Sequence, residues 1–439
     1  MILKGKITQR SHLMNRMRSL ACTLALLLTS FSAGAQSNFY LKNGDRVVFY
    51  GDSITEQRLY TTFVETYIVT RFPKLNVFFV HSGVGGDRVS GGWAGPIDFR
   101  LDRDVIAYRP TVVTCMLGMN DASYQPFKSD IFNNYATGYQ HIVERLKAYS
   151  PNIRMTLIQP SPFDDVTRPV SFEGGYNAVL LRYSQFVKEL AEKSGFDVAD
   201  LNTSVRSTLE RANATDANTA KKIIADRVHP GPSGHLIMAE ALLKAWNAPS
   251  TVSRVEIDAA RKQVNQAENT KVNGFKVSGN VLTWEQRDEA LPFPLGIPKR
   301  LVSDQEVPTL ALTLSSSDFV EALNQEILKV IGLQGTRYRL TIDGEEIGSF
   351  TAEQLAAGVN LATLPTPMTT QALAVHALTS RHNDLHQVRW RQVQMPLNGE
   401  TLPEVSRALA AIDKLDESIV KKQHALAIPK PHKYELTAQ

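Results

Sequence analysis

Four apolar runs recur in the first half of the chain, and each ends in a small or polar loop. They are RVVFYGDS, LNVFFVHSGVGG, PTVVTCMLGMND and NIRMTLIQPSP, and FDVADLN gives a fifth. Between them, segments such as TTFVETYIVTRF and YATGYQHIVERLKAY carry apolar residues at i, i+3 and i+4, which is typical of amphipathic helices. Strands that are apolar throughout, alternating with helices, predict an α/β domain with a parallel sheet covered on both faces.

Polar residues follow the first three predicted strands. Ser53 follows the first, Gly86 the second and Asn120 the third, at separations of 33 and 34 residues. Each separation is about one strand–helix–strand unit. Because ligands bind beyond the carboxyl ends of parallel strands, we expect these residues to gather along one edge of the sheet.

A hydroxyl, a base and hydrogen-bond donors for an oxyanion are the groups that acyl transfer from an ester requires. Ser53, after the Gly51-Asp52 turn, can supply the hydroxyl. His229 in ADRVHPGPSGH is the candidate base, and Asp226, three residues earlier, can orient its imidazole. The backbone N–H groups of Ser53 and Gly86 and the Asn120 amide are the candidate oxyanion donors.

Each of these residues also has an ordinary structural interpretation. Ser53 begins the sequence SITE, which reads as a helix capping box closed by Glu56. Gly86 can serve a turn alone, and Asn120 can cap the next helix. His81 and His235 are weaker candidates for the base, since His81 has no carboxylate at short spacing and His235 falls inside the last predicted helix of the domain.

The blocks GDSITE, GVGGD, GMND and DRVH, in this order, resemble those of the SGNH, or GDSL, hydrolases. The resemblance runs from about residue 45 to 247 and implies a flavodoxin-like three-layer α/β/α sandwich. It makes Ser53 the nucleophile, Gly86 and Asn120 oxyanion donors, and His229 and Asp226 the remaining triad members. Ile54 and Met119 depart from the commonest form of the blocks, but neither side chain performs chemistry. No metal or other cofactor is implied, and no His/Asp/Glu cluster has ligand spacing in the sequence.

Loop residues near the predicted strand ends could contact substrate. The candidates are Arg88, Trp93, Gln159, Tyr176 and Asn177. Phe163, Asp164 and Asp165 also follow the fourth strand. Loop and capping roles are the plainer interpretation for most of them.

Residues 1–35 have the pattern of a secretory signal peptide. Five Lys or Arg residues precede a short apolar run, and an A-x-A sequence ends at Ala35. Translation could begin at Met14 or Met17, and an uncleaved anchor is the alternative. We therefore expect export to the periplasm or the extracellular space, without stable membrane insertion after cleavage.

Removing this leader changes the charge of the protein. The full chain has a net charge of +4, whereas residues 36–439 carry 43 basic and 44 acidic residues, a net charge of −1. The basic character thus belongs to the leader and gives no support for nucleic-acid binding. Cys22 falls in the leader and only Cys115 remains, so no internal disulfide can form.

Residues 251–439 do not continue the strand–helix repeat. We divide the chain into the leader 1–35, a catalytic domain 36–250, a β-rich accessory domain 251–368 and a helical region 369–439. RYRLTIDGEEIGSF predicts a hairpin with a turn at Asp343-Gly344, and VSGNVLTW and VPTLALTL read as further strands. VEIDAARKQVNQAENTKV fits either a helix or two strands. This half could bind carbohydrate, form a wall beside the cleft or only stabilise the enzyme.

The leading hypothesis is an exported serine esterase for small acyl esters, most plausibly acetyl groups on a carbohydrate. An acyltransferase or a lysophospholipase using the same serine is the first alternative. A non-catalytic glycan-binding protein on the same fold is the second, although binding alone does not need the full set of residues. The natural ester and the oligomeric state do not follow from the sequence.

Overall fold

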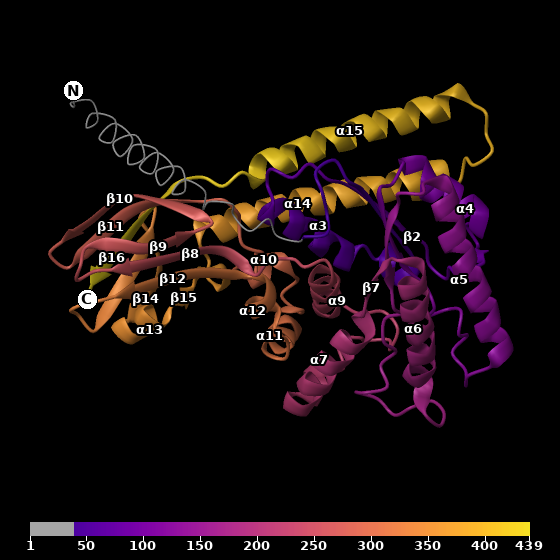
Figure 1. The fold of residues 1–439 in the computed structure, drawn as a ribbon, viewed down its shortest axis with the longest axis horizontal. Helices are drawn as coiled ribbons and strands as arrows, with labels where there is room; N and C mark the ends of the chain where they lie inside the picture. Colours follow the sequence, from indigo (N-terminus) through magenta and orange to yellow (C-terminus); the bar gives the residue numbers. More distant parts are fainter. Residues whose placement is uncertain (1–38) are drawn as a thin grey trace, which may run out of the picture. The chain divides into compact units, whose positions relative to one another are not determined.

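Five parallel strands form the sheet of the first domain (Figure 1). The computed structural model describes residues 39–439. The strand order is β2-β1-β5-β6-β7, which is the flavodoxin-like order. The strands are β1 Arg46–Gly51, β2 Phe78–Gly83, β5 Val112–Met116, β6 Arg154–Ile158 and β7 Asp197–Ala199. All five correspond to predicted strands, so the predicted parallel sheet is confirmed.

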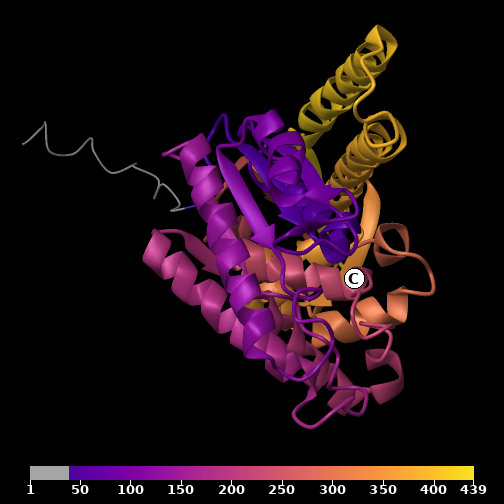
Figure 2. The ribbon, with the colours of Figure 1, turned by 90° about the vertical axis from the view of Figure 1, so that its right-hand side faces the viewer.

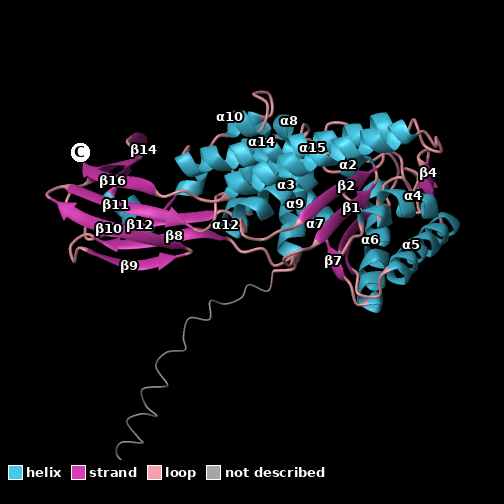
Figure 3. Ribbon diagram, turned by 90° about the horizontal axis from the view of Figure 1, so that it is seen from above, coloured by secondary structure: helices cyan, strands magenta, loops and turns pink. Residues whose placement is uncertain are grey.

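Helices cover both faces of this sheet (Figure 3). The connection from β1 to β2 runs in the opposite direction to the later connections, so right-handed crossovers place their helices on opposite faces. In agreement, α3 packs with α9 and α9 with α7, while α5 packs with both α4 and α6. These helices are α3 Leu59–Arg71, α4 Ile97–Asp104, α5 Ser129–Tyr149, α6 Gly175–Ser194, α7 Leu201–Thr215 and α9 Pro232–Ala245. The three-layer sandwich is therefore confirmed.

The central strands are buried on both sides. Val47, Val48 and Phe49 of β1 and Val112 and Val113 of β5 have no exposed surface. Burial of one such side chain contributes about 1.5–3 kcal/mol, so these runs are held firmly in the core. The loops at their carboxyl ends are thus built on a rigid base.

Short elements complete the domain. They are α2 Ser53–Glu56, η1 Ile106–Tyr108, α8 Ala217–Ala220, β3 Gly91–Gly92 and β4 Gly95–Pro96. The predicted capping box at α2 is wrong, because Asp52 is the N-cap and its Oδ1 accepts the Ile54 N–H at 3.1 Å. The Glu56 carboxylate instead accepts the N–H of Gly85. The Ser53 hydroxyl is therefore not used for capping.

Two sheets make up the second region. One is antiparallel in the order β10-β11-β16-β13-β14, and the other has the order β15-β12-β8-β9, with β8 and β12 parallel. The strands are β8 Thr251–Asp258, β9 Gln263–Glu268, β10 Thr270–Ser278, β11 Val281–Asp288, β12 Gln325–Ile331, β13 Arg337–Ile342, β14 Glu345–Thr351, β15 Val359–Asn360 and β16 His432–Ala438. The β13–β14 hairpin turns at Asp343-Gly344 as predicted, and the ambiguous segment near 255–272 forms strands.

Two features of this region differ from the prediction. VPTLALTL is not a strand but part of helix α11 Val307–Ser315, which begins with Pro308 in its first turn and packs on α7, α8 and α9. Strand β16 was assigned to the helical region, yet it lies between β11 and β13 in the antiparallel sheet. The other short helices are α10 Pro298–Leu301, α12 Phe319–Leu323, α13 Ala352–Ala357 and η2 Leu361–Thr363.

The predicted C-terminal helices are α14 Pro367–Val388 and α15 Pro403–Ala427, with the π-helical turn η3 Arg389–Gln394 after α14. They lie side by side (Figure 2), and both contact α3 of the first domain. Among residues 39–439, no helix combines the length and the apolar character needed to cross a bilayer. The predicted signal peptide lies outside the described residues.

Candidate active site

Ser53, His229 and Asp226 form a hydrogen-bonded chain at the carboxyl edge of the parallel sheet. His229 Nε2 lies 2.8 Å from Ser53 Oγ, and His229 Nδ1 lies 2.7 Å from Asp226 Oδ2. The two ring nitrogens thus connect a hydroxyl with a carboxylate. This is the arrangement in which an imidazole can remove the hydroxyl proton while the carboxylate stabilises the imidazolium.

The loop that carries this histidine is built around Asp226. Its Oδ1 accepts the N–H groups of Val228 and His229 at 2.9 and 2.7 Å, while Arg227 adopts a left-handed conformation with φ 73°. The Arg227 guanidinium binds Asp165 at 2.8 Å, which ties the loop to the segment after β6. The Asp-x-x-His spacing therefore works through a local turn that places both side chains together.

The same hydrogen bonds affect the acidity of Asp226. Partial burial favours the neutral acid, but the hydrogen bonds from the His229 backbone and ring and from Val228 outweigh it and lower the pKa of Asp226. The carboxylate is thus ionised at neutral pH. A negative charge beside His229 Nδ1 favours the protonated imidazole that forms during acyl transfer.

Two backbone N–H groups point to an oxyanion site next to Ser53. Those of Ser53 and Gly86 have no hydrogen-bond partner within residues 39–439. Gly86 has φ +79°, a conformation that glycine adopts without strain. Its N–H belongs to the same peptide group as the Gly85 carbonyl, and Trp93 Nε1 donates to that carbonyl at 2.9 Å. Trp93 therefore fixes the orientation of the peptide that presents the Gly86 N–H.

Trp93 is itself held by the C-terminal region. The Arg391 guanidinium lies over its ring at 4.3 Å, and the Trp390 ring meets it edge-on at 6.1 Å. Arg391 also lies 3.7 Å from the Glu56 carboxylate, which binds the Gly85 N–H. The sequence did not indicate these contacts, because Arg391 is about 300 residues from Trp93. The helical region thus supports the loop that carries Gly86.

Asn120 is the third candidate donor. Its Nδ2 donates to the Asp87 carbonyl at 3.1 Å, and its Oδ1 accepts from the Tyr124 hydroxyl at 3.2 Å. Burial raises the pKa of Tyr124 to about 12, so this hydroxyl keeps its proton. The side-chain amide is fixed from both ends and retains a second N–H for a ligand. Sequence reasoning missed Tyr124, whose role depends on its left-handed turn at φ 55°.

Trp93→Phe is expected to lower kcat about 2- to 10-fold with little change in KM, because it removes one hydrogen bond that holds the oxyanion peptide. The phenyl ring can still stack under Arg391. Initial-rate kinetics with p-nitrophenyl acetate measure both constants. Trp284→Phe is the matched control, since it removes an N–H that donates to Gln286 Oε1 at 3.2 Å within β11 and leaves Trp93 and Gly85 untouched. A raised KM with unchanged kcat would instead make Trp93 a substrate-binding residue.

Three buried carboxyl groups lie beneath the site. Burial raises the pKa values of Asp52 and Asp121 to about 7, and that of Asp87 to about 6 despite its ion pair with Arg100. The folded protein therefore holds protons that the unfolded chain releases near pH 4. Because the native state binds more protons between about pH 4 and 7, the free energy of unfolding falls as pH rises through that range.

Asp52→Asn is expected to remove part of this pH dependence while keeping a helix-capping oxygen. We compare the melting temperature of the variant minus that of the unmodified protein at two pH values. This difference should be a few degrees larger at pH 8 than at pH 5, since ionisation of the buried carboxyl costs the unmodified protein on the order of 1 to 4 kcal/mol. Differential scanning calorimetry at both pH values measures this change. Asp200→Asn is the control, because Asp200 caps α7 in the same way but is exposed. Equal shifts at both pH values would contradict the assignment.

The predicted substrate contacts fall into two groups. Arg88 is exposed, and Trp93 is 55% exposed, so both remain accessible near the site. The prediction for Gln159 and Asn177 is corrected: both are buried, and their amides bind Ser184 and Asn202. Tyr176 is also buried, donates to the Met119 carbonyl and stacks under Tyr124. These three residues support the site from below.

The other histidines do not join the site. His235 is buried, accepts the Tyr60 N–H at 3.2 Å and, because of burial, has a pKa lowered to about 3. His81 does not line the cleft: it is buried, and its Nε2 lies 3.1 Å from Glu65 Oε2, a carboxylate sixteen residues earlier in the chain. Cys115 is buried in β5, as expected for a packing thiol.

The strand order and the hydrogen-bonded groups at the strand ends agree with the resemblance of the sequence to the SGNH, or GDSL, hydrolases. Residues 49–237 match the GDSL-like lipase/acylhydrolase family. The domain that these residues form is therefore a carboxylic ester hydrolase domain.

Individual relatives agree with this classification. An acetylxylan esterase from Geobacillus stearothermophilus is 25% identical over 227 residues, 46% of this chain and 94% of the relative. A GDSL esterase/lipase from Arabidopsis thaliana is 24% identical over 222 residues, 46% of this chain and 87% of the relative. The solved structure of a gut microbial diltiazem-metabolizing enzyme is 26% identical, covers 92% of this chain and all of its own, and has a TM-score of 0.79. That likeness extends into the region after the esterase domain.

Proposed function

We propose that the protein is an exported serine esterase that removes small acyl groups, acetyl above all, from carbohydrates. The observation that carries the proposal is the hydrogen-bonded chain from Ser53 through His229 to Asp226. The proposed oxyanion donors are the Gly86 N–H and the Asn120 amide, which the Asp87 carbonyl holds. A hydroxyl, a base and oxyanion donors in this relation are what ester hydrolysis through an acyl-enzyme requires.

In the first half of the reaction, Ser53 Oγ attacks the ester carbonyl carbon while its proton passes to His229 Nε2. The carbonyl oxygen becomes an oxyanion and accepts hydrogen bonds from Ser53, Gly86 and Asn120. When the tetrahedral intermediate collapses, the bond to the alcohol oxygen breaks and His229 gives its proton to that oxygen. Ser53 then carries the acyl group.

In the second half, water replaces the alcohol. His229 takes a proton from water as its oxygen attacks the acyl carbon, and the oxyanion forms again at the same donors. Collapse releases the carboxylic acid and returns the proton to Ser53. Asp226 stays ionised and holds the His229 ring throughout.

The substrate class is supported by exposure and by the relatives. The side chains of His229 and Asp226 are 35% and 57% exposed, and that of Trp93, which binds the Gly85 carbonyl, is 55% exposed, so a large alcohol such as a polysaccharide can approach the serine. One relative is an acetylxylan esterase. Export is supported by the basic and apolar leader and its A-x-A ending.

The test is a substrate series with the purified protein and with Ser53→Ala as the inactive reference. p-Nitrophenyl esters of increasing acyl length, acetylated xylo-oligosaccharides and diltiazem are each supplied, and acid release is measured. We expect acetate to be released fastest, with kcat/KM falling as the acyl chain lengthens. Faster cleavage of long-chain esters would contradict the acetyl preference, and acylated sugar in place of free acetate would indicate an acyltransferase.

A further inference from the structure

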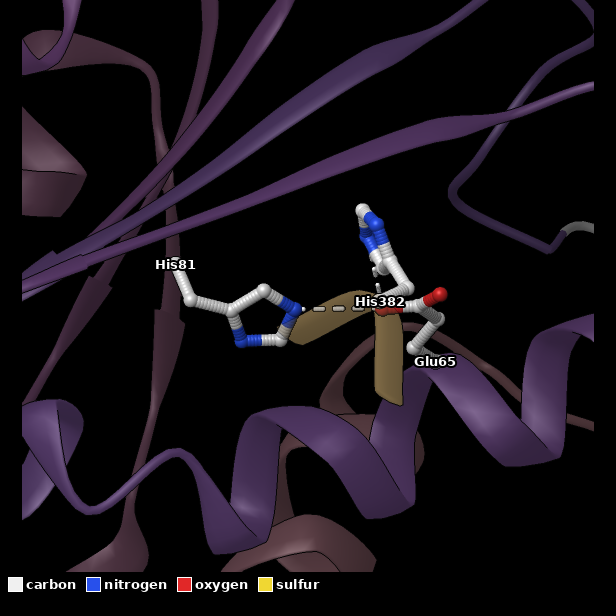
Figure 4. A group of neighbouring side chains, drawn as sticks. All are labelled: Glu65, His81 and His382. Carbon is white, nitrogen blue, oxygen red and sulfur yellow. Dashed lines mark hydrogen bonds and ion pairs between the residues drawn. The ribbon is translucent and has the colours of Figure 1, made fainter. Parts of the chain in front are cut away.

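A second cluster of chemically capable side chains lies apart from the candidate active site. Glu65 of α3, His81 of β2 and His382 of α14 each direct one atom to a common point, and these atoms all lie within 4.8 Å of one another. Figure 4 shows both imidazole rings facing the Glu65 carboxylate. The three side chains are between 0 and 2% exposed. They join two elements of the esterase domain to a helix of the C-terminal region.

The spacing of these atoms suits the ligands of one metal ion. Glu65 Oε2 lies 3.1 Å from His81 Nε2 and 3.9 Å from His382 Nε2. Zinc bonds to nitrogen and oxygen are about 2.0–2.2 Å long, so two ligands of a tetrahedral ion lie about 3.3 Å apart. The 3.9 Å separation is too long for a hydrogen bond. A metal ion between the three side chains would bind both His81 Nε2 and His382 Nε2.

The surrounding residues orient the three side chains as around a metal. The far ring nitrogen of His382 lies 2.6 Å from Asp416 Oδ1, and that of His81 lies 2.6 Å from Thr61 Oγ1. Metal-binding histidines almost always have such an oxygen partner on the other nitrogen, which fixes the tautomer and leaves the first nitrogen free to bind. Gln423 Nε2 donates to Glu65 Oε1 at 2.9 Å, so Oε2 remains for the ion.

Charge leads to the same conclusion. Glu65 is buried and Asp416 is 13% exposed, and both lie against His382, so their negative charges need a positive charge close by. A divalent cation with two neutral imidazoles balances both. Imidazole and carboxylate ligands in tetrahedral geometry are typical of Zn²⁺.

We propose that Glu65, His81 and His382 bind one structural Zn²⁺ that fastens helix α14 to the esterase domain. None of the three contacts Ser53 or His229, so the ion holds the fold and takes no part in ester cleavage. Asp416 and Gln423 extend the connection to α15. The proposal is independent of the substrate.

The test is the metal content of the full chain, purified without a polyhistidine tag and dialysed after supply of Zn²⁺. Elemental (inductively coupled plasma) mass spectrometry should find about one zinc ion per protein molecule. Glu65→Gln and His382→Gln should each reduce this to below about 0.1. His376→Gln is the matched control, since His376 lies on the same helix but binds Thr66, and it should keep the full content.

A second measurement uses the unmodified protein, so its result does not depend on whether a variant folds. Dipicolinate should strip zinc from the unmodified protein and lower its melting temperature by several degrees, and added Zn²⁺ should restore it. Replacement by Co²⁺ should give the visible absorption of a protein-bound cobalt ion. Zinc-supplied protein that holds no metal, or variants that bind as much as the unmodified chain, would overturn the proposal and leave an ion pair between the three residues.

Discussion

Ser53→Ala is expected to lower kcat for p-nitrophenyl acetate by about 10⁴- to 10⁶-fold, because the variant has no oxygen to form the acyl-enzyme. Two contacts near Ser53 indicate that the variant loses the chemistry and not the fold. Ser53 Oγ is the group within 2.8 Å of His229 Nε2, and the buried Asp52 already caps α2. Loss of the hydroxyl should therefore leave folding nearly unchanged. Stopped-flow or initial-rate kinetics, with a melting curve for each protein, measure both effects.

The controls separate chemistry from structure. Ser418→Ala removes a hydroxyl on the exposed side of α15 and should retain full activity. The double variant Ser53→Ala with His229→Ala should be no slower than Ser53→Ala alone, since groups that act as one unit do not contribute additively. If Ser53→Ala keeps more than about one tenth of the rate of the unmodified protein, Ser53 is not the nucleophile.

Asn120→Ala is expected to lower kcat about 10²- to 10³-fold, the usual effect of removing one oxyanion donor. The effect should fall mainly on kcat, because the oxyanion exists in the transition state and not in the bound ester. The Asp87 carbonyl and the Tyr124 hydroxyl hold the amide in place before the substrate arrives. Donors fixed in advance need little reorganisation, which is why a large loss is expected.

Asn134→Ala, on the exposed side of α5, is the matched control for this variant and should not affect the rate. Tyr124→Phe should show an intermediate loss, since the amide remains but is held from one end only. A loss below about threefold in Asn120→Ala would mean that the backbone donors of Ser53 and Gly86 suffice and that Asn120 has another task.

The parallel sheet could be predicted because its strands are buried on both faces and therefore read as unbroken apolar runs, as in Val47–Phe49. The prediction that Ser53, Gly86 and Asn120 gather at one edge of the sheet rests on topology, since consecutive parallel strands end at that edge. The pairing of Asp226 with His229 could be predicted because the two residues lie in one turn, three positions apart.

What the sequence could not provide depends on contacts between distant segments. Glu65, His81 and His382 come together only because α14 packs on α3, and His382 lies 301 positions after His81. Trp93 reads as a substrate contact until its bond to the Gly85 carbonyl is known. VPTLALTL alternates like a strand, but packing against α7, α8 and α9 selects the helix.

The place of β16 has a consequence for how this protein is made. Strand β16, His432–Ala438, fills the middle of a five-stranded sheet and is synthesised after the other four strands. Until β16 arrives, β11 and β13 each present a row of unpaired backbone groups to any passing chain. The antiparallel sheet therefore reaches its native pairing only after helices α14 and α15, which precede β16 in the chain, have also been synthesised.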